Sequence, residues 1–88
     1  MVWTIEIANK AEKELSKLDK NVQKQIIHYL ETKILTAEHP RVFGKSLTHE
    51  LSGYWRYRVG DYRIMCHIND EKVTIMVVRI GHRSKVYK

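Results

Sequence analysis

Apolar and polar side chains alternate along residues 54–59 and again along residues 62–69, on either side of Gly60-Asp61. A period of two is typical of a half-buried strand, and a glycine-containing pair between two such runs indicates a tight turn. A further turn at Asp70-Glu71 leads into the run Val73–Ile80, which is apolar on both faces, as in a central strand. These three strands predict an antiparallel meander.

The N-terminal half adds one strand and two helices, because its apolar residues first alternate and then recur at spacings of three and four. The strand has to join the sheet to bury Trp3, Ile5 and Ile7. The expected elements are a strand at 2–8, a helix at 9–18 with Asn9 and Glu12 as its capping pair, a second helix from a cap at Asp19 to about residue 38, where His39-Pro40 ends it, and a connecting loop at 39–53.

The resulting order of elements is β-α-α-β-β-β. It predicts an α+β fold in which a helical hairpin packs on one face of a four-stranded, mainly antiparallel sheet. At 88 residues, we expect one domain spanning residues 1–88.

The cysteine content and the hydropathy of the chain predict where the protein is located and whether it binds a metal. With Cys66 as its one cysteine, the chain offers neither an intrachain disulfide nor the Cys/His spacing of a zinc site. A reducing, cytoplasmic location follows as the expectation. No leader pattern and no membrane-spanning run is evident. We therefore expect no membrane association, no metal and no cofactor.

Positive charge is concentrated in the second half of the chain. Residues 1–50 hold 8 Lys/Arg against 7 Asp/Glu, whereas residues 51–88 hold 8 against 3. If the apolar positions of the hairpin face the helices, then Arg56, Arg58 and Arg63 project from the opposite face. Neighbouring arginines repel one another, so an anion between them would favour this arrangement. A basic surface that serves solubility is the plain alternative.

The C-terminal segment adds groups that transfer protons or bind phosphate, namely His82, Arg83 and Tyr87. RNA carries its own nucleophile, the 2′-hydroxyl, and its attack on the adjacent phosphate needs a base, an acid and cations rather than a metal. Arginines could stabilise the transition state, while Tyr87 or His82 could move protons. Each of these two residues could equally be structural or merely exposed.

The order of elements, the Gly60-Asp-Tyr-Arg63 segment and the ending Gly81-His-Arg-Ser-Lys-Val-Tyr87 resemble the RelE/ParE superfamily of bacterial toxins, closest to its RelE branch, over essentially the whole chain. The resemblance implies the toxin of a type II toxin–antitoxin pair: a ribosome-dependent endoribonuclease that cleaves mRNA in the ribosomal A site and is neutralised by a cognate antitoxin. The positions that match the RelE active site are Arg56, Arg58, Arg63, Arg83 and Tyr87.

Two of these positions depart from the RelE pattern. Arg56 and Arg58 stand where RelE-type sites have lysines, and arginine cannot act as a base because its pKa is above about 12. The proton transfers therefore fall to Tyr87 or His82. Two other functions remain open: a ParE-like inhibitor of DNA gyrase that acts by protein binding, and a non-catalytic RNA-binding protein.

Overall fold

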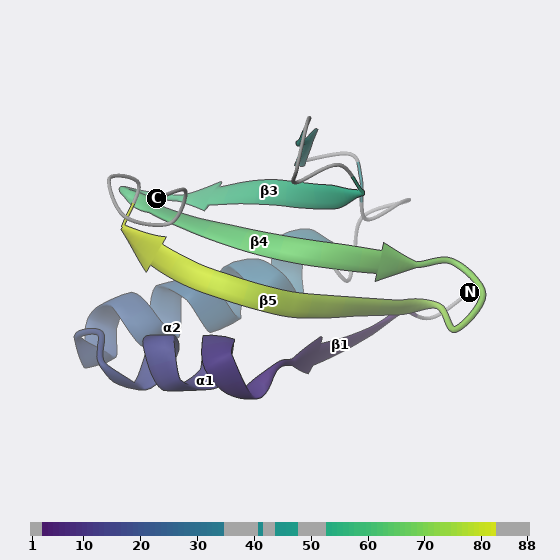
Figure 1. The fold of residues 1–88 in the computed structure, drawn as a ribbon. Helices are drawn as coiled ribbons and strands as arrows, with labels where there is room; N and C mark the ends of the chain where they lie inside the picture. The colour runs from purple at the N-terminus through teal and green to yellow at the C-terminus, as the bar shows by residue number, and fades with distance from the viewer. Residues whose placement is uncertain (1–2, 35–40, 42–43, 48–52, 83–88) are drawn as a thin grey trace.

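The computed structural model describes residues 3–34, 41, 44–47 and 53–82. These residues form an α+β fold, as predicted, with two helices against a single sheet (Figure 1). The elements are β1 (Thr4–Ile7), α1 (Asn9–Ser16), α2 (Lys20–Tyr29), the π-helical turn η1 (Leu30–Ile34), β2 (Lys45–Ser46), β3 (Tyr54–Val59), β4 (Tyr62–Asn69) and β5 (Thr74–His82).

The sheet has five strands in the order β1-β5-β4-β3-β2, rather than the predicted four. The additional strand is β2, which pairs antiparallel with β3. It was missed because two exposed residues, Lys45 and Ser46, are too few to show a period. Strand β1 pairs in parallel with β5, and the other pairs are antiparallel. The prediction that β5 is central is confirmed.

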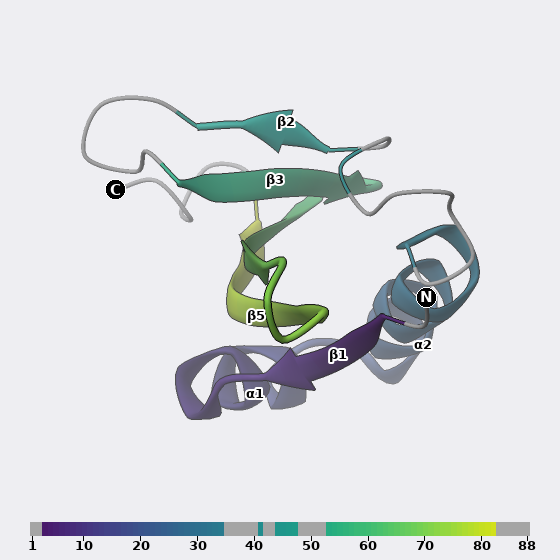
Figure 2. The same cartoon turned by 90° about the vertical axis from the view of Figure 1, so that its right-hand side faces the viewer.

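Both helices lie on one side of the twisted sheet, as the two views show (Figures 1 and 2). Helix α1 begins at Asn9, and Ala8 occupies the N-cap without a side-chain hydrogen bond, so the predicted Asn9–Glu12 capping pair is wrong. Asp19 does occupy the N-cap position of α2. The α-helical part ends at Tyr29, earlier than predicted, and continues as η1. The predicted stop at His39-Pro40 lies outside the described residues.

The hydrophobic core lies between the helices and the inner face of the sheet. Its fully buried side chains include Ile26 and Ile34 from the helical layer and Tyr57, Ile64, Cys66, Ile75, Val77 and Ile80 from the sheet. Within the described ranges, no helix is long and apolar enough to cross a membrane.

A β-bulge in β5 changes which of its side chains face the core. Met65 pairs with Arg79 while its neighbour Cys66 pairs with Val77, so Val78 is an extra residue on β5. The shift places Ile80 opposite Ile64, where both are buried. Beyond the bulge, even-numbered residues of β5 face the helices.

Candidate functional site

The outer face of the sheet, opposite the helices, carries the three arginines predicted for it. Arg56 and Arg58 flank Tyr57, which is fully buried on the inner face. Arg63 of β4 pairs directly with Arg58 across the hairpin. Directly opposed residues of an antiparallel pair lie on the same face of the sheet. The turn at Gly60, whose φ is 59°, keeps this pairing in register.

One further cation extends this cluster and was not predicted. Lys45 of β2 pairs with Arg56 in the sheet register. It escaped the sequence analysis because the segment around it shows no strand period. We call Lys45, Arg56, Arg58 and Arg63 the basic cluster.

Acidic partners distinguish two other described arginines, Arg41 and Arg79, from Arg56 and Arg58. Arg41 binds both carboxylate oxygens of Asp70, at 3.0 and 2.8 Å. The guanidinium of Arg79 reaches Glu14 of α1 at 3.2 Å. Within the part of the chain that the structure describes, neither Arg56 nor Arg58 forms an ion pair.

Arg56 is also the one described residue with a buried side-chain polar atom, its Nε, that has no hydrogen-bond partner. An unpaired buried donor lowers stability by about 1–3 kcal/mol. No carboxylate among the described residues binds the Arg56 guanidinium. It lines a hollow of about 130 Å³ together with Tyr29, Lys45 and Arg58. A second hollow, of about 100 Å³, lies between Arg58 and Arg63 beside the turn.

Tyr29 packs against the core and also lines the hollow beside Arg56. Its ring meets that of Tyr57 edge to face, with centroids 6.5 Å apart. Burial raises the pKa of the Tyr29 phenol, so this hydroxyl stays protonated at neutral pH. A protonated phenol beside the basic cluster can donate a hydrogen bond to an anion.

The structure does not bring His82 to the basic cluster. Because of the bulge, His82 pairs with Tyr62, and its ring meets the ring of Tyr62 edge to face at 5.7 Å. Tyr62 packs against the core, so this pair belongs to the helix-covered face. Arg63, the next residue along β4, pairs instead with Gly81 on the outer face. Without the bulge, even-numbered residues of β5 would have shared the face of the arginines. The other two predicted site residues, Arg83 and Tyr87, lie outside the described residues.

Two buried side chains, those of Cys66 and Tyr57, are unsuited to catalysis. Cys66 is fully buried, and burial raises the pKa of its thiol to about 12, which disfavours the reactive thiolate. Burial also raises the pKa of Tyr57 well above the ordinary value. Among the residues with described positions, no group of three or more His, Cys, Asp or Glu side chains could hold a metal ion.

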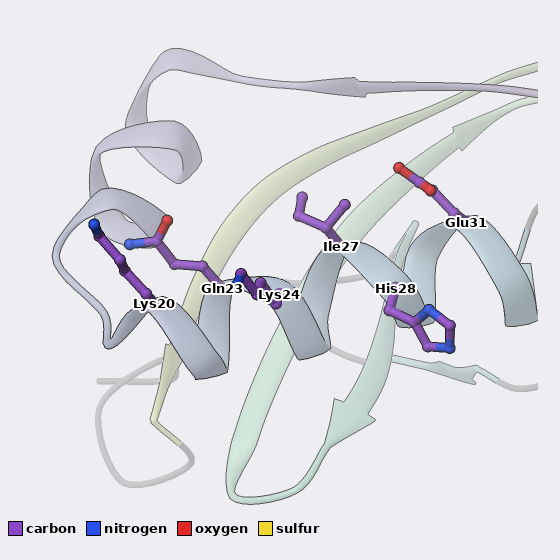
Figure 3. Close-up of a pocket in the computed structure, with 6 residues that line it drawn as sticks. All are labelled: Lys20, Gln23, Lys24, Ile27, His28 and Glu31. Atoms are coloured by element: carbon purple, nitrogen blue, oxygen red, sulfur yellow. The ribbon is translucent and has the colours of Figure 1, made fainter.

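A larger hollow, of about 460 Å³, lies on the helical layer along α2 and η1 (Figure 3). It carries both signs of charge, since Lys20 and Lys24 line it together with Glu31. This mixture agrees with a solvated helix surface and has no cluster of like charges that would favour an anion.

Comparisons with known proteins agree with this fold. The model of the family described as ParE toxin of the type II toxin–antitoxin system parDE matches residues 5–87. Toxin RelG of Mycobacterium tuberculosis is 28% identical to this chain over 88 residues, which are 100% of this chain and 99% of the relative. Toxin RelE of the same organism is 26% identical over 86 residues, which are 98% of this chain and 87% of that relative.

A solved structure gives the same result. The crystal structure of the RelBE2 toxin–antitoxin complex from M. tuberculosis contains a chain with a TM-score of 0.86 and 27% identity, covering 97% of this chain and 95% of that one. The match over nearly the whole length, together with the five-stranded sheet and its two helices, identifies the chain as a toxin of type II toxin–antitoxin systems that belongs to the RelE/ParE superfamily and is of RelE type.

Proposed function

We propose that this toxin is a ribosome-dependent endoribonuclease that cleaves mRNA in the ribosomal A site and so inhibits translation in the cytoplasm. The observation that carries the proposal is the basic cluster, in which Arg56 and Arg58 have no acidic partner among the described residues. Cations held in this way by a folded sheet are already oriented for a phosphate, so little reorganisation accompanies its binding.

The reaction would be an attack of the 2′-hydroxyl of RNA on the adjacent phosphate, without a metal. Arg56, Arg58 and Arg63, with Arg83, would stabilise the negative charge that develops on the phosphate oxygens. Arginine cannot take the proton from the 2′-hydroxyl. We propose Tyr87 for a proton transfer ahead of His82, since His82 shares the helix-covered face with Tyr62.

Primer extension on mRNA in a translating extract tests this function. Arg58→Ala, Arg63→Ala and Tyr87→Phe are each expected to reduce cleavage by at least tenfold, because each removes a group that acts in the transition state. Arg41→Ala is the matched control, as it removes an arginine whose partner is Asp70 and is expected to leave cleavage intact. Full cleavage by all three site variants would refute the proposed mechanism.

The relative in the RelBE2 structure is bound to its antitoxin. We propose that a cognate antitoxin likewise neutralises this toxin, with acidic side chains placed against the basic cluster. Inhibition should therefore weaken as salt is raised, because exposed charges are screened.

A ParE-like inhibitor of DNA gyrase is the second candidate, favoured by the matching family, which is described as ParE toxin. Such an inhibitor would act by protein binding and would need no catalytic group. A block of gyrase supercoiling by the purified protein, with mRNA left intact, would establish this function in place of the first.

A further inference from the structure

The outer face of the sheet has a third hollow, of about 460 Å³, near the basic cluster. Four strands contribute to it. Met76 and Val78 of β5 supply apolar surface, while Tyr54 of β3 and His67 of β4 supply two rings. The remaining lining residues are polar: Glu6, Asn69, Lys72 and Thr74.

Strand β3 links this hollow to the basic cluster, because it contributes residues to both. Tyr54 lies two residues before Arg56 on the same strand, so both side chains point to the outer face about 7 Å apart. That distance is within the reach of a single nucleotide. A phosphate held by Arg56 and Arg58 would leave the adjoining part of the nucleotide above Tyr54.

The chemistry of the hollow differs from that of the basic cluster. Tyr54 and His67 pair in the sheet register, and their rings meet edge to face with centroids 5.7 Å apart. This contact keeps the half-buried Tyr54 ring in one orientation, as a stacking surface requires. Glu6 of β1 places a carboxylate at the hollow, which repels phosphate but accepts hydrogen bonds from amino groups.

Two of the polar side chains that line the hollow already form hydrogen bonds within the turn after β4. The Asn69 side-chain oxygen already accepts the backbone N–H of Lys72 at 3.0 Å, and the Thr74 hydroxyl donates to the backbone carbonyl of Lys72 at 2.9 Å. These two bonds stabilise the turn. The Glu6 carboxylate is the one negatively charged acceptor among the residues that line the hollow.

We propose that this hollow is a nucleobase subsite, which binds a base of the RNA whose phosphate lies at the basic cluster. The inference rests on the proposed function and adds a determinant of sequence preference to it. The base would stack on Tyr54 and donate an exocyclic amino group to Glu6. Guanine, adenine and cytosine carry such a group and uracil does not, so uracil should be disfavoured at this position.

Two measurements on the purified toxin test the subsite. In the first, nucleoside monophosphates are added and the His67 ring signals are followed by NMR. We expect GMP to shift them and to bind wild type about 5- to 150-fold more tightly than Tyr54→Ala, the range that loss of one stacked base implies. Tyr54→Phe, which keeps the ring, should bind as wild type does. Glu6→Gln should reduce the difference between GMP and UMP.

The second measurement maps cleavage sites on translated mRNA for the same variants. Tyr54→Ala is expected to lose the discrimination against uracil at one position next to the cut while it still cleaves. Cleavage by Tyr54→Ala with unchanged base preference would overturn the subsite and leave the nuclease function standing. Wild-type protein that binds GMP at His67 but does not cleave would overturn the nuclease function and leave the subsite standing.

If the hollow bound a protein instead of a nucleobase, the NMR and binding results would differ from those expected above. No shift of the His67 signals with any nucleotide, together with weaker antitoxin binding by Tyr54→Ala, would overturn the nucleobase proposal.

Discussion

Replacement of Arg56 by methionine is expected to make the fold more stable and the toxin less active. Methionine keeps the unbranched apolar stem of arginine but removes the guanidinium, whose buried Nε has no partner among the described residues. It also removes a positive charge that faces Lys45 across the β2–β3 pair. Both changes relieve an unfavourable contribution to the folded state.

The expected gain can be worked from these two contributions. An unsatisfied buried donor costs about 1–3 kcal/mol, and two like charges directly opposite in a sheet cost a further few tenths, roughly 0.2–1 kcal/mol. The free energy of unfolding should therefore rise by about 1–4 kcal/mol. For a domain of this size, each 1 kcal/mol corresponds to about 4–8 °C in Tm.

Urea unfolding followed by tryptophan fluorescence measures this change, and primer extension measures cleavage by the same sample. Arg58→Met is the matched control, because Arg58 is exposed and its replacement relieves only the like-charge contact with Arg63, which should raise the free energy of unfolding by roughly 0.2–1 kcal/mol. Both variants should lose cleavage. If Arg56→Met unfolds at a lower urea concentration than wild type, the argument that Arg56 is held at a cost to stability is refuted.

Three further predictions concern the fold. Gly44→Ala should lower the free energy of unfolding by about 1–3 kcal/mol, because the added Cβ would lie 3.0 Å from two ring atoms of the buried Tyr57. Glu14→Ala should lower it by about 1–2 kcal/mol, because this carboxylate accepts the Ile80 backbone N–H at 3.1 Å as well as a guanidinium. The free energy of unfolding should fall as the pH rises from the ordinary thiol pKa of 9.0 toward about 12, because in this range Cys66 ionises only in the unfolded chain. The Cys66→Ala variant should lack this part of the pH dependence.

Each of these predictions has its own control, read out by urea unfolding. Ser46→Ala, at an exposed position of β2, should unfold as wild type does, and equal behaviour of Gly44→Ala would contradict the close approach to Tyr57. Glu12→Ala removes an exposed carboxylate of the same helix and should have little effect, so an equal loss in both glutamate variants would argue against the contact with β5. Rapid labelling of Cys66 by a thiol reagent in the folded protein at pH 8 would contradict its burial.

The fold class, both strands of the β3–β4 hairpin and the face on which its arginines lie can be predicted from the sequence alone. Alternation is a local property, so Tyr57 and Ile64 alone decide that Arg56, Arg58 and Arg63 point the other way. The short strand β2 gave no such signal, and Lys45 joined the cluster only through pairing with β3.

The side of the sheet taken by His82 was decided by the tertiary structure. One extra residue in β5 reverses the alternation, and that residue is found at Val78 because Ile80 becomes buried opposite Ile64. Among the described residues, the absence of an acidic partner for Arg56 is likewise a tertiary property, since Glu14 and Asp70, far away in sequence, pair with Arg79 and Arg41 instead. Period and composition describe each strand separately, whereas register and ion pairing depend on which segments the folded chain brings together.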